Sequence, residues 1–284
     1  MLENFLYALN IVVETVVELS ALAILQIMHT LFLKFGGAAV AKPEQFAQIA
    51  DLILERNYHY KKIVVVVSAM ANMTDELLTL ARQVHPSPPK REQDMLISVG
   101  ERISMSLLAM ALDLKGKVAL SLTGSQAGII TTSNHAEAKI IDVRPHRVVK
   151  ALDEGKIVIV AGFQGVSKEG EITTLGRGGS DTTAVALAVA LGAEKVEFYK
   201  DVPGIFAEDP KKNPAAEFYS TLDYTQALEI TQKGAKVLQS RCIDLAARNN
   251  LPLHVLPFRE PKESGTLIGK LPRLASPSLI YEAP

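Results

Sequence analysis

The sequence predicts an α/β protein built around a mostly parallel β-sheet with helices on both faces. Two patterns lead to this prediction. Short runs of apolar, β-branched residues recur along the chain, and a helical stretch separates each run from the next. The runs are apolar throughout instead of alternating with polar residues, which is typical of strands that helices cover on both sides. The chain has 284 residues, which is long enough for one large domain or two small ones.

The predicted elements follow one another in a regular order. Strands are predicted at the β-branched runs, residues 31–35, 63–67, 118–122, 157–161, 196–199 and 253–256. Helices are predicted between them, at residues 43–56, 74–82, 92–112, 145–153, 181–191 and 223–230, the last leading into 235–249. Thr74 is a good N-cap for its helix, and Ser180 or Asp181 can cap the helix at 181–191. Gly100 lies inside a predicted helix, where glycine costs about 1 kcal/mol relative to alanine. We therefore expect a ligand or another backbone to approach closely there.

Composition excludes several classes of function. The formal net charge is −1, so nothing favours a general attraction to nucleic acid. A single cysteine, Cys242, excludes an internal disulfide and a cysteine-rich metal site, and it fits a reduced, cytosolic protein with a buried, inert thiol. The six histidines lack the spacing of a histidine-bound metal site.

The first 33 residues are unusually apolar and contain no Lys or Arg before Lys34. They lack the basic start and the cleavage site of a secretory signal. The charge-free stretch 19–33 is too short to span a bilayer comfortably, so a membrane anchor is the weakest interpretation. Two interpretations remain open: a helix that packs against another subunit or the domain itself, and a non-native extension before a true start at Met28.

The most informative stretch is residues 173–193, a glycine-rich loop followed directly by a predicted helix. Gly176, Gly178 and Gly179 let the backbone turn tightly and approach a ligand, and the helix that follows presents free amides to an anion. Arg177 adds a planar fork that suits a carboxylate or a phosphate. The alternative is a plain connection whose glycines serve only packing. The loop matches neither a Walker A sequence nor a dinucleotide-binding turn.

Other polar residues lie at the predicted strand ends. Parallel strands bring their carboxyl ends to one edge of the sheet, so we expect these residues to form one site. Taken singly, Lys34 could be a solvated lysine before a turn and Glu101 a surface charge. The candidates from this pattern are Lys34, Gly36, Gly37, Ser68, Thr74, Glu101, the segment Lys200 to Lys211, and Lys236.

In this order, the motifs resemble those of aspartokinases. They are KFGG, VSAMANMTD, SVGERIS, TTLGRGGSDTTA, KDVPGIFAEDP and GAKVL, and the likeness runs from about residue 31 to residue 268. The resemblance implies the amino acid kinase fold, a three-layer αβα sandwich. It also implies transfer of a phosphoryl group from ATP, with Mg²⁺, to the β-carboxylate of L-aspartate, the first step towards lysine, diaminopimelate, threonine and methionine. The implied catalytic domain covers 31–270, between an apolar extension (1–30) and a tail (271–284).

The resemblance also implies roles for individual residues. Lys34 neutralises the transferring phosphoryl group and Asp181 organises the site, while Arg177 binds a carboxylate of aspartate and Glu101 its ammonium group. Mg²⁺ is held mainly by the ATP phosphates, with no metal ligands from the protein. Ser68, Thr74 and Ser180 add hydrogen bonds to the substrate. The ATP side comprises Gly36, Gly37, Gly178, Gly179, Lys200, Asp201, Phe206, Asp209, Pro210, Lys211 and Lys236.

Three departures from the family pattern raise alternatives. Ala38 and Ala39 stand where aspartokinases have Thr-Ser, and Gln239-Ser240 stands where they have His-Pro. The sequence also ends soon after SGTLI, so we expect no ACT modules and no feedback control through them, unless a separate regulatory subunit supplies it. A homodimer is equally open. The alternatives are a related kinase acting on glutamate, acetylglutamate, carbamate or UMP, and a protein that binds nucleotide or amino acid without turnover.

Overall fold

The computed structural model describes residues 30–208, 210, 213, 215–234, 237–259, 265–269 and 280–282. An eight-stranded sheet forms its centre, in the order β12-β14-β13-β9-β1-β2-β6-β3. All strands from β13 to β3 in this order run parallel, and β14 is antiparallel to β13. The strands are β1 (Thr30–Phe35), β2 (Lys62–Val67), β3 (Ala119–Leu122), β6 (Ile157–Ala161), β9 (Lys195–Lys200), β12 (Thr221–Leu222), β13 (Leu253–Pro257) and β14 (Thr266–Ile268). All six predicted strands are therefore present, and the predicted fold class is confirmed.

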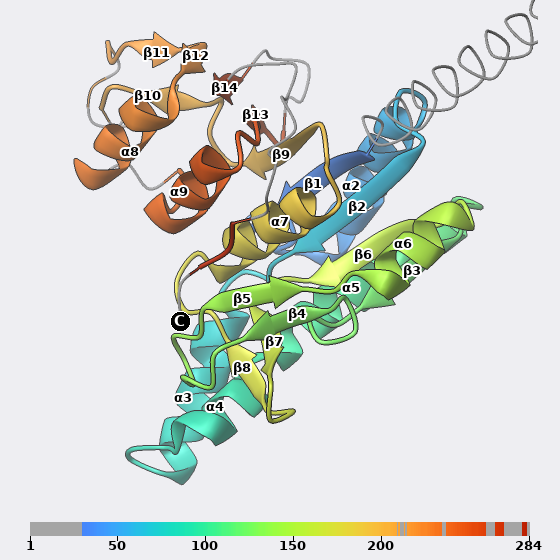
Figure 1. Cartoon of the computed structure of the whole chain (residues 1–284), viewed down its shortest axis with the longest axis vertical. Helices are drawn as coiled ribbons and strands as arrows, with labels where there is room; N and C mark the ends of the chain where they lie inside the picture. The colour runs from blue at the N-terminus through green and yellow to red at the C-terminus, as the bar shows by residue number, and fades with distance from the viewer. Residues whose placement is uncertain are drawn as a thin grey trace, which may run out of the picture.

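Helices cover both faces of this sheet, which gives three layers (Figure 1). One face packs against α6 (His146–Asp153), α7 (Gly179–Ala190), α8 (Tyr224–Gln232) and α9 (Ser240–Arg248). The other face packs against α2 (Pro43–Asn57) and α5 (Val99–Leu114). Side chains of a strand point alternately to the two faces, so β1 serves both cores: Phe32 lies in the first, and Leu31, Leu33 and Phe35 in the second.

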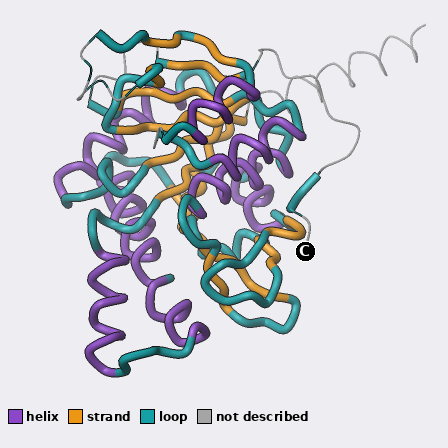
Figure 2. The backbone as a smooth tube through the Cα atoms, turned by 90° about the vertical axis from the view of Figure 1, so that its left-hand side faces the viewer, coloured by secondary structure: helices purple, strands orange, loops and turns teal. Residues whose placement is uncertain are grey.

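A second, four-stranded sheet was not predicted. It has the order β5-β4-β7-β8 and consists of β4 (Ile129–Thr131), β5 (Ile140–Val143), β7 (Gln164–Ser167) and β8 (Ile172–Thr174). Below the main sheet, α3 (Met73–Val84) and α4 (Lys90–Ile97) extend beside these strands (Figure 2). A small pair of strands, β10 (Ile205–Phe206) and β11 (Phe218–Tyr219), completes the described strands.

Several predicted helix boundaries need correction. The helix predicted at 92–112 is two helices, α4 and α5, that meet at Ser98. The N-cap of α3 is Asn72, so Thr74 lies inside the helix and does not cap it. The N-cap of α7 is Gly178, in a left-handed conformation, so neither Ser180 nor Asp181 caps that helix. Finally, α9 begins at Ser240 with Gln239 as its N-cap, later than the predicted start at 235.

One described stretch, Lys90–Leu114, has the length and composition of a membrane-crossing helix. Its inner face nevertheless packs on the sheet through Leu108 and Leu112, both fully buried, as in a core helix. Cys242 is buried, as predicted, and burial raises the pKa of its thiol to about 12. The predicted N-terminal extension, apart from Thr30 in β1, and most of the predicted tail lie outside the described residues.

Candidate functional site

The candidate site lies where the strand order reverses. From β1 the chain continues to β2 on one side, whereas β9 returns to the other side of β1. In open α/β sheets, ligands bind outside the carboxyl ends of the strands at such a point. Lys34 lies near the end of β1 and Lys200 is the last residue of β9, so two cations from distant parts of the chain face this position.

A single carboxylate joins the two lysines. Lys34 Nζ lies 2.5 Å from Asp181 Oδ1, and Lys200 Nζ lies 3.0 Å from Asp181 Oδ2. Asp181 is in the first turn of α7, on the face of the sheet to which Phe32 and Phe198 point. Strand side chains alternate, so Lys34 and Lys200, two residues beyond these phenylalanines, point to the same face. The cluster therefore follows from strand periodicity and from α7 packing across β1.

The cluster is almost dry and carries an excess positive charge. The exposed fractions of Lys34 and Asp181 are only 4% and 5%. Burial lowers the pKa of Lys34, and Asp181 offsets only part of that effect. Burial alone would raise the pKa of Asp181, but the charges of Lys200 and Lys34 outweigh it and hold that pKa below its ordinary value. Two cations around one anion can neutralise a further anion, such as a phosphate.

The turn after β1 approaches both Lys34 and the loop after β2. A Cβ on Gly36 would lie 3.6 Å from Lys34 Nζ, an ordinary contact distance. A Cβ on Gly37 would lie 3.1 Å from the carbonyl oxygen of Ala69, which is tighter than usual contacts. Gly37 is also held in place by its carbonyl, which accepts a bond from the Ala71 amide. Glycine at 37 is thus needed for close packing of the two loops.

Glu101 is a buried carboxylate with a free oxygen. Its Oε1 accepts a hydrogen bond from the Ala69 amide at 3.0 Å, whereas its buried Oε2 has no hydrogen-bond partner among the described residues. Burial raises the pKa of Glu101 to about 7, against the opposing effect of its backbone hydrogen bonds and of nearby Lys34. The interpretation as a surface charge is therefore wrong. The close approach expected at Gly100 is also present, because a Cβ there would lie 2.7 Å from Ala69 Cβ.

The glycines at the start of α7 have a packing reason of their own. Gly178 has φ +73°, and a Cβ on it would lie 1.9 Å from Gln239 Cγ. A Cβ on Gly179 would meet Leu175 and Phe163 at 2.7 and 3.0 Å. Phe163 itself has φ +69°, an uncommon conformation for a bulky residue, and such strain is often found at functional sites.

The remaining predicted residues fall into four groups. Ser68 directly follows β2, and Ser180 directly precedes Asp181 on α7. Arg177 is exposed, forms no hydrogen bond or ion pair with any described residue, and precedes α7 on the same loop. Thr74 lies on α3, Asp201 and Pro210 follow β9, and Phe206 packs edge-on against Phe218 in the β10–β11 pair. Asp209, Lys211 and Lys236 lie outside the described residues.

The two alanines at the turn occupy different environments. Ala38 is exposed, and its carbonyl accepts a bond from the Gln45 side chain at 3.2 Å. Ala39 is 3% exposed and belongs to the apolar core on the α2 face. A hydroxyl at position 39 would therefore enter an apolar environment, whereas one at position 38 would face solvent.

Two charged residues near this site were missed from the sequence. Asp94 on α4 is completely buried, and Arg241 on α9 contacts the segment before Gly176. Asp94 and Glu101 lie on the buried stripe of α4 and α5 together with Ile97 and Leu108. Acids on an apolar helix face are rare unless they have partners, and that signal could have identified Asp94. No comparable pattern in the sequence marks Arg241.

Comparison with known proteins gives three consistent findings. The amino acid kinase family profile matches residues 29–257. An aspartokinase of Mycolicibacterium smegmatis is 55% identical over 223 residues, which is 78% of this chain and 53% of that protein. An aspartate kinase structure from Synechocystis superimposes with a TM-score of 0.79 at 42% identity, covering 89% of this chain and 42% of that one.

A fourth comparison involves bound ligands. The structure of E. coli aspartokinase III in complex with aspartate and ADP has a TM-score of 0.77 at 27% identity, and covers 85% of this chain and 64% of that chain. The chain spans little more than half the length of the curated relatives that it matches, for example 53% and 57% of two of them.

Proposed function

Because this chain belongs to the amino acid kinase family, we propose that it transfers the γ-phosphoryl group of ATP to the β-carboxylate of L-aspartate. The product is β-aspartyl phosphate, which would enter the synthesis of lysine, diaminopimelate, threonine and methionine. One observation carries the proposal: a buried carboxylate oxygen of Glu101 has no hydrogen-bond partner among the described residues and lies near the Lys34–Asp181–Lys200 cluster. This juxtaposition suits an amino acid whose ammonium group is bound beside a polyphosphate.

At the phosphate end, Lys34 and Lys200 neutralise the phosphate oxygens, and Asp181 holds both ammonium groups at the switch point. Phosphoryl transfer needs positioning and charge neutralisation more than covalent help from the protein. Both oxygens of Asp181 face lysines, so we assign Mg²⁺ mainly to the phosphate oxygens, as is usual for this ion. We assign the backbone of Gly36, Gly37, Gly178 and Gly179 to the phosphates, because Gly36 lies beside Lys34 and the other pair lies at the start of α7, whose first turn carries Asp181. The loop from Asp201 to Lys211 together with Lys236 would bind the rest of the nucleotide.

At the amino acid end, Glu101 Oε2 accepts a hydrogen bond from the ammonium group of aspartate, and the Arg177 guanidinium binds the α-carboxylate of aspartate. Arg177 suits this role because it is exposed and unpaired among the described side chains. Ser68, Thr74 and Ser180 supply hydroxyl groups around the substrate. The reacting β-carboxylate is already a nucleophile, so no general base is required. One of its oxygens bonds to the γ-phosphorus as the bond from phosphorus to the bridging oxygen of ADP breaks.

The proposal is tested by trapping the product. ATP, Mg²⁺ and L-aspartate with hydroxylamine should yield aspartyl hydroxamate, because hydroxylamine attacks acyl phosphates. The same assay with glutamate and acetylglutamate, and ADP release with carbamate or UMP, tests the related kinases. ADP release with one of those acceptors and none with aspartate would replace the proposed substrate.

A second candidate function is supported by Ala38 and Ala39. Without the two hydroxyls that aspartokinases have at this turn, the chain could bind nucleotide and amino acid without turnover. Each lost hydrogen bond is worth about 1 kcal/mol, so a reduced rate is the stronger expectation. Calorimetric binding of ADP and aspartate, with no hydroxamate at high enzyme concentration, would favour the second candidate.

A further inference from the structure

Asp94 holds the end of β8, which leads into the loop at residues 176–178, the Arg177 loop. Its carboxylate accepts hydrogen bonds from the Thr174 amide at 3.1 Å and the Thr174 hydroxyl at 2.6 Å. It also accepts the Ala136 amide at 3.1 Å, and His135 Nδ1 lies 2.8 Å away. Asp94 therefore fixes two segments at once from its place on α4, and both of its oxygens are used.

Arg241 holds the next residue from a different helix. Its guanidinium donates to the Leu175 carbonyl at 2.7 Å and to the Ala138 carbonyl at 2.7 Å. Asp94 and Arg241 thus hold the same two segments, 136–138 and 174–175. In Figure 1, α4 lies below β8, whereas α9 lies above β5, so the two helices reach these segments from different sides.

The two held segments are also joined to each other. The Ala138 amide donates to the Thr174 carbonyl at 2.9 Å, and the Leu175 amide donates to the Phe163 carbonyl at 2.9 Å. Ala136 has φ +71°, a conformation that non-glycine residues rarely adopt, and its bond to Asp94 accompanies that strain. Leu175 is followed by Gly176, where the held segment ends and the loop begins.

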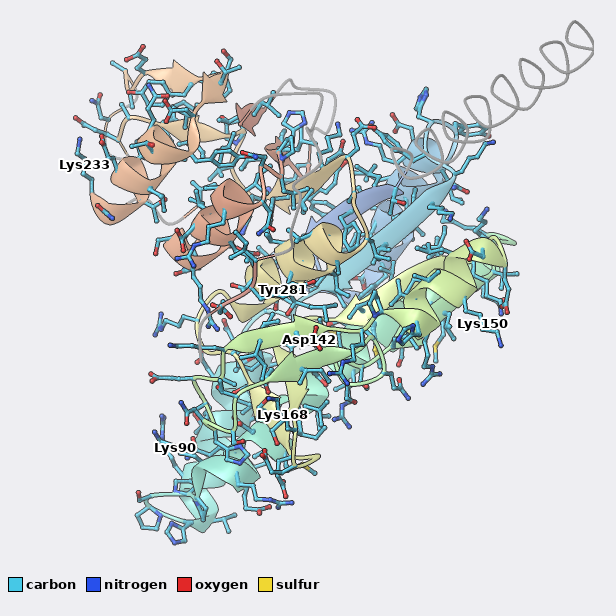
Figure 3. All side chains as sticks on the ribbon, in the orientation of Figure 1. Lys90, Asp142, Lys150, Lys168, Lys233 and Tyr281 are labelled. Carbon is cyan, nitrogen blue, oxygen red and sulfur yellow. The ribbon has the colours of Figure 1, made fainter. Side chains whose placement is uncertain are left out.

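The end of the chain supports Arg241. Glu282 forms a hydrogen-bonded ion pair with the Arg241 guanidinium, and the Glu282 amide donates to the Ile140 carbonyl at 3.1 Å on the edge of β5. Figure 3 shows Tyr281 between α7 and β5, near Asp142. Arg241 is thus held on its outer side while its inner side reaches the two carbonyls.

We propose that Asp94 and Arg241 are positioning residues that set the location of the Arg177 loop and thereby the affinity for the carboxylate of the amino acid substrate. Gly176 and Gly178 both have positive φ, and glycine allows many backbone conformations, so the loop needs an external anchor. Arg177 has no partner of its own among the described residues to fix it. The inference about affinity rests on the proposed function; the anchoring itself does not.

The test uses two variants and two matched controls in the full chain. Asp94→Asn keeps the side-chain volume but replaces one acceptor oxygen with an NH₂ group. That group donates hydrogen bonds and would face the donors of Ala136 and Thr174. Arg241→Lys keeps the charge but loses the fork that reaches two carbonyls. The controls change similar ion pairs at exposed positions nearby. Glu171 lies directly before β8 and pairs with Arg91 on α4, so one control is Glu171→Gln. Arg248 pairs with Asp244 on α9, so the other control is Arg248→Lys.

Two readouts decide the proposal. Amide hydrogen exchange in a peptide covering 173–180 should be at least tenfold faster in both test variants than in the wild type and the controls. The KM for aspartate should rise about tenfold or more, while the KM for ATP changes less than twofold. A general loss of structure would instead lower kcat and the melting temperature without this selectivity.

The failures are distinguishable. Unchanged exchange at 173–180 would overturn the anchoring role whatever the protein phosphorylates. Faster exchange with an unchanged KM for aspartate would show that the anchored loop does not set substrate affinity. If the wild type forms no product from aspartate, the proposed function fails, and hydrogen exchange still decides whether Asp94 and Arg241 anchor the loop.

Discussion

At the scale of single residues, Asp181 has a structural role beside the chemical role that we propose for it. It is the shared counterion of Lys34 and Lys200. Asp181→Ala would therefore leave the buried Lys34 and its neighbour Lys200 without a negative charge to balance them. Removing one partner of a buried ion pair typically costs about 3–5 kcal/mol. We expect a loss of that size in the free energy of unfolding, measured by urea titration, together with loss of turnover.

The matched control for Asp181 is Asp153→Ala. Asp153 forms a surface ion pair with Lys62, with 57% of its side chain exposed. Exposed pairs contribute about 0–1 kcal/mol, so this variant should be close to the wild type in urea. Equal stability of the two variants would mean that Lys34 and Lys200 are exposed to solvent and that the buried charge cluster does not form.

Glu101 predicts a specific pH dependence of substrate affinity. Burial raises its pKa to about 7, so the carboxylate becomes neutral as the pH falls below that value. A neutral Glu101 cannot balance the ammonium group of an amino acid. The KM for aspartate should therefore rise as the pH falls from 8 to 5.5, and Glu101→Gln should have a high KM that varies little with pH. A parallel rise in both proteins would exclude Glu101 as the titrating group.

The same pKa affects stability in the opposite direction. The folded-state pKa lies above the ordinary value of 4.5 for a glutamate, so the contribution of Glu101 to stability is fully present below pH 4.5 and is lost as the pH rises through 7. The shift corresponds to a contribution on the order of 3 kcal/mol. Between pH 8 and pH 5.5 the free energy of unfolding, measured by urea titration, should therefore rise by about 2 kcal/mol more in the wild type than in Glu101→Gln, because most but not all of this contribution is present at pH 5.5.

The sequence predicted which residue types meet at the site better than how they are oriented. Lys34 and Asp181 were placed together by their motifs, and the structure brings them into contact. Asp94 and Arg241 were missed. The apolar face of its helix could have marked Asp94 as buried, but its partners and those of Arg241 are amide and carbonyl groups that approach only in the folded chain. The free oxygen of Glu101 was equally invisible, since it depends on burial by the loop after β2.

At the scale of elements, the start of α7 depends on Gly178. A side chain there requires a left-handed backbone, which costs roughly 1–2 kcal/mol, and a Cβ would overlap Gln239 Cγ at 1.9 Å. We expect Gly178→Ala to lower the free energy of unfolding by about 2 kcal/mol or more, measured by urea titration. In a Gln239→Ala background the cost should be smaller but not absent, because the clash with Cγ is gone while the backbone strain and a contact of 2.6 Å with the Cβ of residue 239 remain. An equal cost in both backgrounds would exclude the part of the Gln239 side chain beyond Cβ as its cause.

The elements that the sequence predicted share a clear signal. The six parallel strands from β13 to β3 in the central sheet are mostly apolar runs, such as β2 with KIVVVV, and the pattern located all six. The short strands β12 and β14 at one edge of the same sheet were not predicted. The strands β4, β5, β7 and β8 have only three or four residues each, and β7 (QGVS) and β8 (ITT) contain more polar than β-branched aliphatic residues. Such strands are defined by their partners and not by local periodicity. The break between α4 and α5 at Ser98 has no local marker either.

At the scale of the whole molecule, strand order determines where the chemistry occurs. The order β9-β1-β2 cannot be read from alternating strands and helices, because many orders are compatible with one pattern. Only this order brings the end of β9 beside the end of β1, so that Lys200 joins Lys34. The sequence could predict that the loops share one edge of the sheet, but not which of them are neighbours.

This arrangement makes ligand binding testable without turnover. A ligand at a hundred times its Kd stabilises the folded state by about 2.7 kcal/mol, and each kcal/mol raises the melting temperature of a chain of this size by about 2–4 °C. MgADP at that concentration should therefore raise the melting temperature by about 5–10 °C in a thermal shift assay. Aspartate should add a further rise, because its ammonium group would bind to Glu101, apart from the lysine cluster that binds the phosphates of the nucleotide.

The control variant separates the two ends of the site. Glu101→Gln removes the charge for the ammonium group and leaves Lys34, Asp181 and Lys200 in place, so it should keep the response to MgADP and lose most of the response to aspartate. Loss of both responses would mean that the nucleotide and the amino acid do not occupy separate parts of one site. A wild type that responds to neither ligand would contradict the assignment of this sheet edge to ATP and aspartate, because binding at the switch point does not depend on the rate of phosphoryl transfer.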